Sequence, residues 1–145
     1  MRKIDSFSYA CGAMDCFNEI VNAGVKKLAL GHPTANRALR DEYIAVAEEI
    51  CQKYGTKYYV EDASLLTDLF PLSLNQDKYN LVFYKEDAVL QAYLSLKERK
   101  ARLVEQKAYC GEERRAIAVE FGRLLSYTEE AIARLIDANG EKEGL

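Results

Sequence analysis

The sequence predicts a small three-layer α/β domain, in which helices cover a mostly parallel sheet of three or four strands and a helical hairpin follows. Two observations carry this prediction. Helical patterns alternate with short extended runs, and one pattern occurs twice: a helix, a glycine (Gly24 or Gly55), a valine or threonine, a lysine and an extended run. Such alternation is typical of α/β folds. An all-α bundle is the alternative if the extended runs are helical.

The first helix is predicted over residues 8–23. Apolar side chains recur there at the spacing of one helical face, at Met14, Phe17, Ile20 and Val21. Asp5 or Ser6 could cap its start, and Gly24 suits its end. The run VKKLALG (residues 25–31) alternates leucines with smaller or polar residues and stops at Gly-His-Pro, which predicts a strand.

The second helix is predicted over residues 34–54, with Thr34 as its N-cap after Pro33. Its apolar face comprises Leu39, Tyr43, Val46, Ala47, Ile50 and Cys51. The run TKYYVED (residues 56–62) then predicts a second strand. The next segment, residues 63–71, fits either two helical turns or a short strand, and helix is favoured.

The run YNLVFYK (residues 79–85) is the clearest strand pattern in the chain. Both of its faces are apolar, which is typical of a strand covered on both sides, as in a parallel sheet. Two helices are predicted after it, over residues 88–109 and 112–138. We therefore expect one domain over residues 1–145, made of an α/β core (1–97) and a helical hairpin (98–145) that packs on the core or extends from it.

Composition restricts the function classes. The net charge is −3, whereas binding of nucleic acid or of an anionic membrane surface usually requires a basic excess. No apolar run has the length of a signal peptide or a membrane span, which predicts a cytoplasmic protein. The four cysteines, Cys11, Cys16, Cys51 and Cys110, form neither a CxxC pair nor a zinc pattern, so no metal and no cofactor is expected.

The parallel sheet predicts where a site should lie, because ligands of open α/β sheets bind at the carboxyl ends of the strands. Polar residues follow each predicted strand. The predicted ligand-binding residues are Thr34, Asn36, Arg37, Glu61, Asp62 and Lys85, and His32 is the candidate acid or base. In a parallel sheet these groups would converge on one edge.

Each of these residues also has a structural interpretation. A histidine side chain suits proton transfer near neutral pH, but a histidine before proline, as at His32, is more often a loop residue. Thr34, Asn36 and Arg37 could hold a phosphate at a helix N-terminus, although GHPTANR matches no phosphate-binding motif. Glu61 and Asp62 could bind Mg²⁺ or a sugar hydroxyl, but an acidic pair after a strand more often caps the next helix, and the cap is favoured.

Two functional hypotheses follow. The first is a cytoplasmic α/β domain that binds a polar or anionic small molecule at the strand ends, with catalysis by His32 left open. The second is a non-catalytic interaction protein that forms a homodimer through its C-terminal helices, where interleaved charges suit a second copy as well as solvent.

Overall fold

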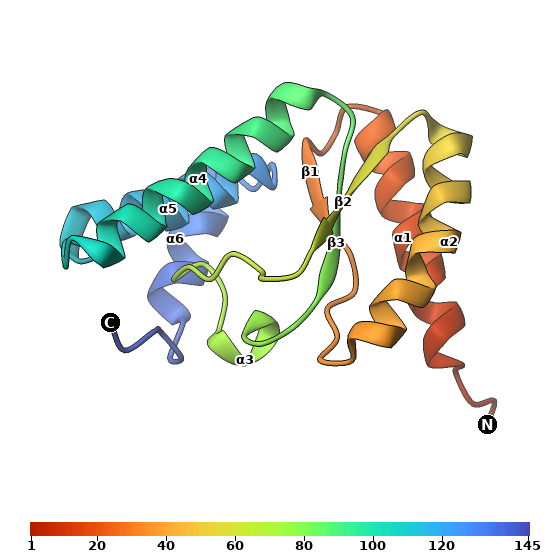
Figure 1. The fold of residues 1–145 in the computed structure, drawn as a ribbon, viewed down its shortest axis with the longest axis horizontal. Coiled ribbons are helices and arrows are strands. Elements are labelled where there is room, and N and C mark those ends of the chain that lie inside the picture. The colour runs from red at the N-terminus through yellow and green to blue at the C-terminus, as the bar shows by residue number, and fades with distance from the viewer. The chain divides into compact units, whose positions relative to one another are not determined.

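The computed structural model describes residues 1–145 and contains six helices and three strands (Figure 1). In chain order they are α1 (Ser6–Asn22), β1 (Leu28–Leu30), α2 (Arg37–Tyr54), β2 (Lys57–Glu61), α3 (Leu72–Asn75), β3 (Asn80–Tyr84), α4 (Asp87–Glu105), α5 (Gly111–Leu124) and α6 (Glu129–Ala138). The chain divides into two compact units. The first comprises residues 1–64 and 77–85, and the second comprises residues 65–76 and 86–145.

The prediction of a mostly parallel sheet is wrong, and so is the prediction of a predominantly α/β architecture. The sheet has three strands in the order β1-β3-β2, and β3 is antiparallel to both of its neighbours. In the register, Ala29 lies opposite Phe83, and Tyr59 lies opposite Val82. Since both edge strands oppose β3, β1 and β2 run in the same direction. Helices make up most of the remaining structure.

The connections explain the strand directions. Helix α2 carries the chain from the end of β1 back to the start of β2, so these two strands run alike, as predicted for a crossover. The segment between β2 and β3 (residues 62–79) contains only the four-residue helix α3. It returns the chain to the edge of the sheet where β2 ends, and β3 therefore runs the opposite way.

In the first unit, α1 and α2 cover one face of the sheet (Figure 1). Their apolar faces meet the sheet in one core, which includes Ala10, Met14, Val21, Ala29, Tyr43, Ala47, Ile50, Leu81 and Phe83. Helix α1 is capped by Asp5, whose side chain accepts from the N–H of Ser8. Every residue of β3 is buried, as its two apolar faces predicted. β3 is the central strand of an antiparallel sheet rather than a member of a parallel one.

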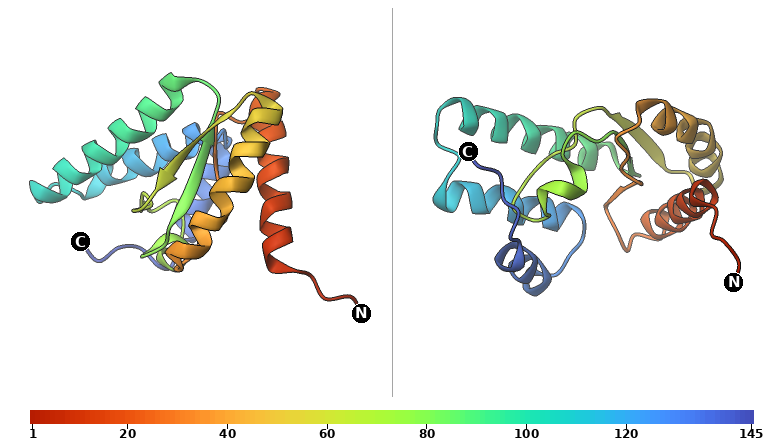
Figure 2. Two further views of the ribbon diagram at one scale, coloured as in Figure 1. Left: turned by 45° about the vertical axis from the view of Figure 1, so that its right-hand side comes forward. Right: turned by 90° about the horizontal axis from the view of Figure 1, so that it is seen from below.

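The prediction of a two-helix hairpin is wrong, because the chain forms three helices there, α4, α5 and α6. Helix α4 packs on α5, and α5 packs on α6 (Figure 2). The predicted helix over residues 112–138 is broken after Leu125, because Ser126 has a left-handed φ of 65° and Thr128 caps α6 by accepting from the N–H of Ala131. Gly122 permits the close approach of α6, since a Cβ there would lie 2.5 Å from Cγ1 of Ile132.

The segment that fitted either helix or strand forms neither. Residues 63–70 are loop, and the helix that follows them, α3, begins only at Leu72. Phe70 packs edge-on against Phe121 and Tyr127, with ring centroids 6.0 and 6.2 Å apart. The apolar residues of this segment therefore complete the core of the second unit, and no fourth strand joins the sheet.

Candidate functional site

Most of the predicted site residues lie at the end of the sheet where β1 and β2 terminate. His32 and Thr34 follow β1, Glu61 is the last residue of β2 and Asp62 follows it, so all four lie at this end of the sheet. Lys85 does not lie with them, because β3 is antiparallel to β1 and β2 and ends at the opposite end of the sheet. There the Lys85 Nζ donates to Oδ1 of Asn22 at 3.0 Å. The predicted convergence of all the strand-end residues is therefore wrong for Lys85.

A residue that the sequence analysis did not select, Arg40, organises this edge. Its side chain is 1% exposed. One terminal nitrogen donates to the main-chain carbonyls of Glu61 (2.8 Å) and Asn80 (3.3 Å), which ties the end of β2 to the start of β3. The other donates to Oδ1 of Asp62 at 2.7 Å, and Nε donates to Oδ1 of Asp41 at 2.9 Å.

The sequence contained a signal for this role. Arg40 lies three residues before Tyr43 and seven before Ala47, which places it on the buried face of α2. Burial alone would lower the pKa of Arg40, but the hydrogen bonds that it donates to Asp62 and Asp41 raise that pKa above its usual value. The guanidinium therefore stays charged inside the fold, and it acts as a structural clamp between strand ends.

The start of α2 also differs from the prediction. Asn36, not Thr34, is the N-cap, and its Oδ1 accepts from the N–H of Leu39 at 3.2 Å. Thr34 instead forms an antiparallel bridge with Tyr79, and its Oγ1 accepts from the N–H of Asn36. Arg37 and His32 are exposed. Two of the residues predicted to bind phosphate at this helix terminus, Thr34 and Asn36, therefore use their side-chain oxygens in local hydrogen bonds.

The carboxylates at this edge have unlike environments. The side chain of Glu61 is buried, and its Oε1 accepts from the N–H of Ala63 at 3.1 Å, which shapes the turn after β2. No helix begins there, so neither Glu61 nor Asp62 is a helix cap. The side chain of Asp62 is 59% exposed although Arg40 holds it in place. Asp62 is therefore a positioned carboxylate that faces solvent.

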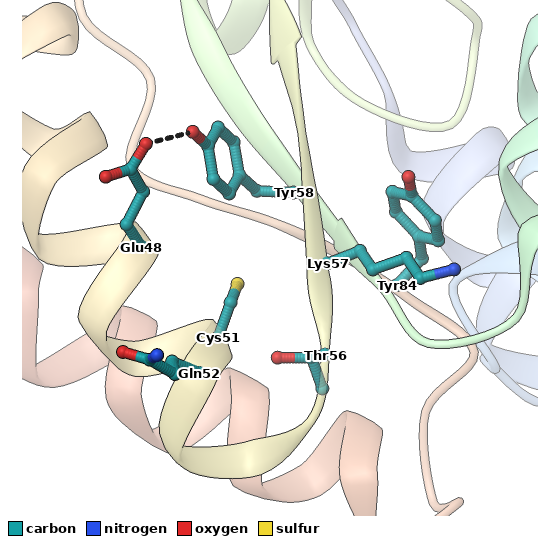
Figure 3. A pocket seen from close by; sticks show the side chains of 7 residues that line it. All are labelled: Glu48, Cys51, Gln52, Thr56, Lys57, Tyr58 and Tyr84. Carbon is teal, nitrogen blue, oxygen red and sulfur yellow. Dashed lines mark hydrogen bonds between the residues drawn. The ribbon is translucent and has the colours of Figure 1, made fainter.

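A hollow lies at the other end of β2, between this strand and the C-terminal half of α2 (Figure 3). It encloses about 600 Å³, which is within the size range of ligand pockets, and it is open to solvent. Its lining residues are Glu48, Cys51, Gln52, Thr56, Lys57, Tyr58 and Tyr84. Figure 3 shows Tyr58 directed toward α2, whereas Lys57 and Tyr84 point away from that helix. The hollow therefore lies at the end of the sheet where β2 begins and β3 ends.

The polar groups of the hollow are suited to binding rather than to nucleophilic chemistry. The hydroxyl of Tyr58 donates to Oε1 of Glu48 at 2.9 Å, and this bond, more than burial, raises the pKa of Tyr58 (Figure 3). Burial raises the pKa of the Cys51 thiol, so the reactive thiolate is disfavoured. Asn18 accepts from both Cys51 Sγ (3.8 Å) and Thr56 Oγ1 (2.7 Å), which holds these two side chains in place.

The second unit contains a separate cluster of charged side chains, of which Asp68 is buried and the others are partly buried. Arg114 donates from Nε and a terminal nitrogen to the two carboxylate oxygens of Asp68, both at 2.9 Å. The same guanidinium donates to the carbonyl of Glu143, while Lys100 donates to the Glu143 carboxylate at 2.7 Å. The ring of Tyr109 lies near both cations. This cluster anchors the C-terminal segment to α4 and α5.

We expect that replacing Tyr109 with phenylalanine will stabilise the protein at high pH. The Tyr109 hydroxyl is buried without a hydrogen-bond partner, and burial, followed by Asp68 and Glu143, raises its pKa. Above pH ~10 the unfolded chain loses this proton while the folded chain keeps it, so the folding free energy weakens as the pH rises. Urea titrations at pH 8 and 10.5 should show that the free energy of unfolding falls less between these pH values in Tyr109→Phe than in the wild type.

The exposed Tyr9 offers a matched control for that measurement. Tyr9→Phe should retain the alkaline loss of stability that the wild type shows. Equal losses for wild type and Tyr109→Phe would contradict the role assigned to the buried phenol.

Comparison with known proteins does not extend this picture. No protein-family model matches the sequence, and neither a curated protein nor a solved structure does. Within the chain itself, no group of three or more His, Cys, Asp or Glu side chains is arranged to hold a metal ion. None of the six helices has the length and apolarity that crossing a membrane requires.

Proposed function

We propose that this protein is an interaction protein that takes up an extended strand along the edge of β2. One observation carries the proposal. β2 lies at the edge of the sheet, and a hollow opens beside its first residues, Lys57 and Tyr58. A strand added to a sheet needs an open row of backbone groups and space for its side chains.

The hydrogen-bond pattern of β3 indicates which backbone groups of β2 face outward. The N–H of Gly31 donates to the carbonyl of Leu81 at 2.8 Å, so the main-chain groups of Leu81 face β1. Along an antiparallel strand the main-chain groups of successive residues point to alternate sides. The N–H and C=O groups of Val82 therefore face β2 and form hydrogen bonds with those of Tyr59. The N–H and C=O groups of Tyr58 and Val60 consequently point away from the sheet.

Selection from a library of linear peptides displayed on phage tests this proposal. Val60→Pro is the counter-selection variant, because proline removes an outward N–H and is compatible with an edge strand. We expect enriched peptides to bind the wild type and shift the amide NMR signals of Tyr58 and Val60, and to lose this binding in Val60→Pro. Peptides that shift only signals away from β2, or an unsuccessful selection, would overturn the proposal.

A second candidate function is the binding of a polar small molecule where β1 and β2 end. The exposed carboxylate of Asp62, which Arg40 holds at 2.7 Å, favours it. A carboxylate here favours hydroxyl or ammonium ligands over the phosphate considered from sequence. A thermal-shift screen with amino sugars and diamines should raise the melting temperature of the wild type more than that of His32→Ala. Equal shifts would exclude His32 from the site.

Dimerisation through the C-terminal helices is a weaker proposal than strand addition. The apolar faces of these helices are used within the second unit, where Tyr93, Leu96, Ile117, Phe121, Ile132 and Ile136 are buried. The hollow on the outer side of α5 encloses about 330 Å³ and is lined mainly by charges of both signs, among them Glu112, Arg115 and Arg123. A charged surface of this kind is as compatible with exposure to solvent as with a partner chain, so it does not favour dimerisation.

A further inference from the structure

We propose that the second unit contains a recognition site for an acidic peptide segment, and that residues 139–143 of the same chain occupy this site as a displaceable strap. These residues, called the strap below, follow α6 and form neither helix nor strand. The inference is independent of the edge of β2, because the strap and every residue that holds it belong to the second unit.

The first half of the strap is held by hydrogen bonds from an amide side chain and to the main chain. Asn139 is buried, and its Nδ2 donates to the carbonyls of Asp68 and Phe70, both at 3.1 Å. Two residues further on, the carbonyl of Glu141 accepts from the N–H of Leu72 at 3.0 Å. These contacts recognise an amide side chain and the backbone two residues after it.

Both glutamates of the strap bond to the site through their carboxylates. Glu141 accepts from Oγ of Ser73 at 3.1 Å. Glu143 accepts from Nζ of Lys100 at 2.7 Å, and its carbonyl accepts from Arg114 at 2.8 Å. The side chains of Lys100 and Glu143 are only 13% and 14% exposed, so this ion pair is largely removed from solvent. The site is therefore suited to an acidic segment.

The contacts of the strap fall on alternate residues. Asn139, Glu141 and Glu143 bond to the site, whereas Gly140 and Lys142, which lie between them, are exposed. Side chains of an extended chain share one face at this spacing. Recognition of alternate side chains is typical of sites that bind extended peptides. The pattern Asn-x-Glu-x-Glu therefore describes the occupant.

The charges of the site explain why its occupant should be acidic. Without the strap, the cations Lys100 and Arg114 would face one carboxylate, that of Asp68, which leaves an excess of one positive charge. Arg114 pairs with Asp68 through two hydrogen bonds of 2.9 Å, so the excess falls on Lys100. An unpaired charge is unfavourable in a partly buried position. A carboxylate from another molecule should therefore replace that of Glu143 when the strap leaves.

The composition of the strap favours its release. It contains no apolar side chain, and segments with few buried apolar contacts open at a low free energy. The strap also leaves one polar group of the site unsatisfied. The ring of Tyr109 lies near Lys100 and Arg114, and its buried hydroxyl has no hydrogen-bond partner. A partner segment that supplies an acceptor there would gain a contact that the strap does not make.

Because the strap is part of the chain, a partner has to compete with a tethered occupant, whose effective concentration is on the order of millimolar. We therefore expect the wild type to bind a matching peptide weakly, and a variant with a weakened strap to bind it more tightly. A second copy of the chain would only replace each strap with an identical one. The partner that gains contacts is thus a segment of a different protein.

Fluorescence anisotropy with a labelled peptide tests the site. The peptide copies residues 138–145, and a control peptide carries glutamine in place of both glutamates. The wild type is compared with the double variant Asn139→Ala/Glu143→Gln, whose strap has lost the two side chains that bind most deeply. We expect the double variant to bind the peptide at least about tenfold more tightly than the wild type does. The control peptide should bind at least about tenfold more weakly.

Lys100→Met in the double variant tests which group holds the peptide. It should weaken peptide binding at least about tenfold. Arg102→Met is the matched control, because Arg102 is an exposed cation on the same helix. The amide NMR signal of Leu72 should shift when the peptide binds. Glu143→Gln alone keeps the buried amide of the strap and should already raise the peptide affinity, so the test does not depend on the folding of the double variant.

Three results would overturn the proposal. They are equal peptide affinities of the wild type and both strap variants, equal binding by Lys100→Met and Arg102→Met, and equal binding of the glutamine peptide. Dimers of the wild type in sedimentation velocity, lost in Glu143→Gln, would show that straps exchange between copies and would overturn the assignment to a different protein. Strand addition at β2 is unaffected by these outcomes, since its peptides are selected and mapped at another unit.

Discussion

Arg40→Met is expected to lower the free energy of unfolding of the first unit by about 3 kcal/mol, because the loss of the guanidinium leaves two strand-end carbonyls without their buried donor. Those carbonyls belong to Glu61 and Asn80. Methionine keeps the length and the apolar stem of the side chain, so packing changes little. Urea denaturation followed by circular dichroism measures the loss, and amide exchange in β3 should show that it falls on the sheet.

Arg37→Met provides the control for Arg40, because Arg37 lies on the same helix with an exposed side chain. Its effect should stay within about 0.5 kcal/mol, as for most surface substitutions. If Arg40→Met is equally mild, the guanidinium does not hold the strand ends together.

Arg114→Ala is expected to lower the free energy of unfolding of the second unit by about 3–5 kcal/mol. A loss of this size is usual when one partner of a buried ion pair is removed. The side chains of Arg114 and Asp68 are only 15% and 9% exposed, so Asp68 would be left as an uncompensated buried carboxylate. The carbonyl of Glu143 would also lose its donor. Urea denaturation measures the loss, and amide exchange should locate it in α4 and α5.

The adjacent residue supplies a stringent control. Arg115 forms an ion pair with Asp137 at 3.2 Å, but both side chains are largely exposed. Arg115→Ala should therefore change the free energy of unfolding by less than about 1 kcal/mol. Similar losses for Arg114→Ala and Arg115→Ala would show that burial does not decide the strength of these pairs.

The positions of many elements could be predicted because their signals are local. Asp5 at the start of α1 and Gly55 at the end of α2 act through their own turns, so the residues on either side are sufficient to recognise them. Gly55 ends α2 in the left-handed conformation, with φ 68°, that glycine adopts most readily. The break at Ser126 had no such signal, since a serine rarely takes a positive φ.

The candidate site was predicted in part. The ends of β1 and β2 meet at one edge because α2 carries the chain between them, and local patterns indicated all three elements. Lys85 was misplaced because its location depended on the direction of β3. The residues of the proposed docking edge, Tyr58 and Val60, were not selected, because a strand's edge position is a property of the whole sheet.

By itself, the sequence determined where most helices and strands lie, which faces of α1 and α2 are apolar, and that β3 is buried on both sides. These features depend on side-chain periodicity and caps within one element. Only the tertiary structure decided the direction of β3, the burial of Arg40 and the edge position of β2. Each of these depends on pairing between segments distant in the chain, and an alternating pattern of side chains is the same whichever way a neighbouring strand runs.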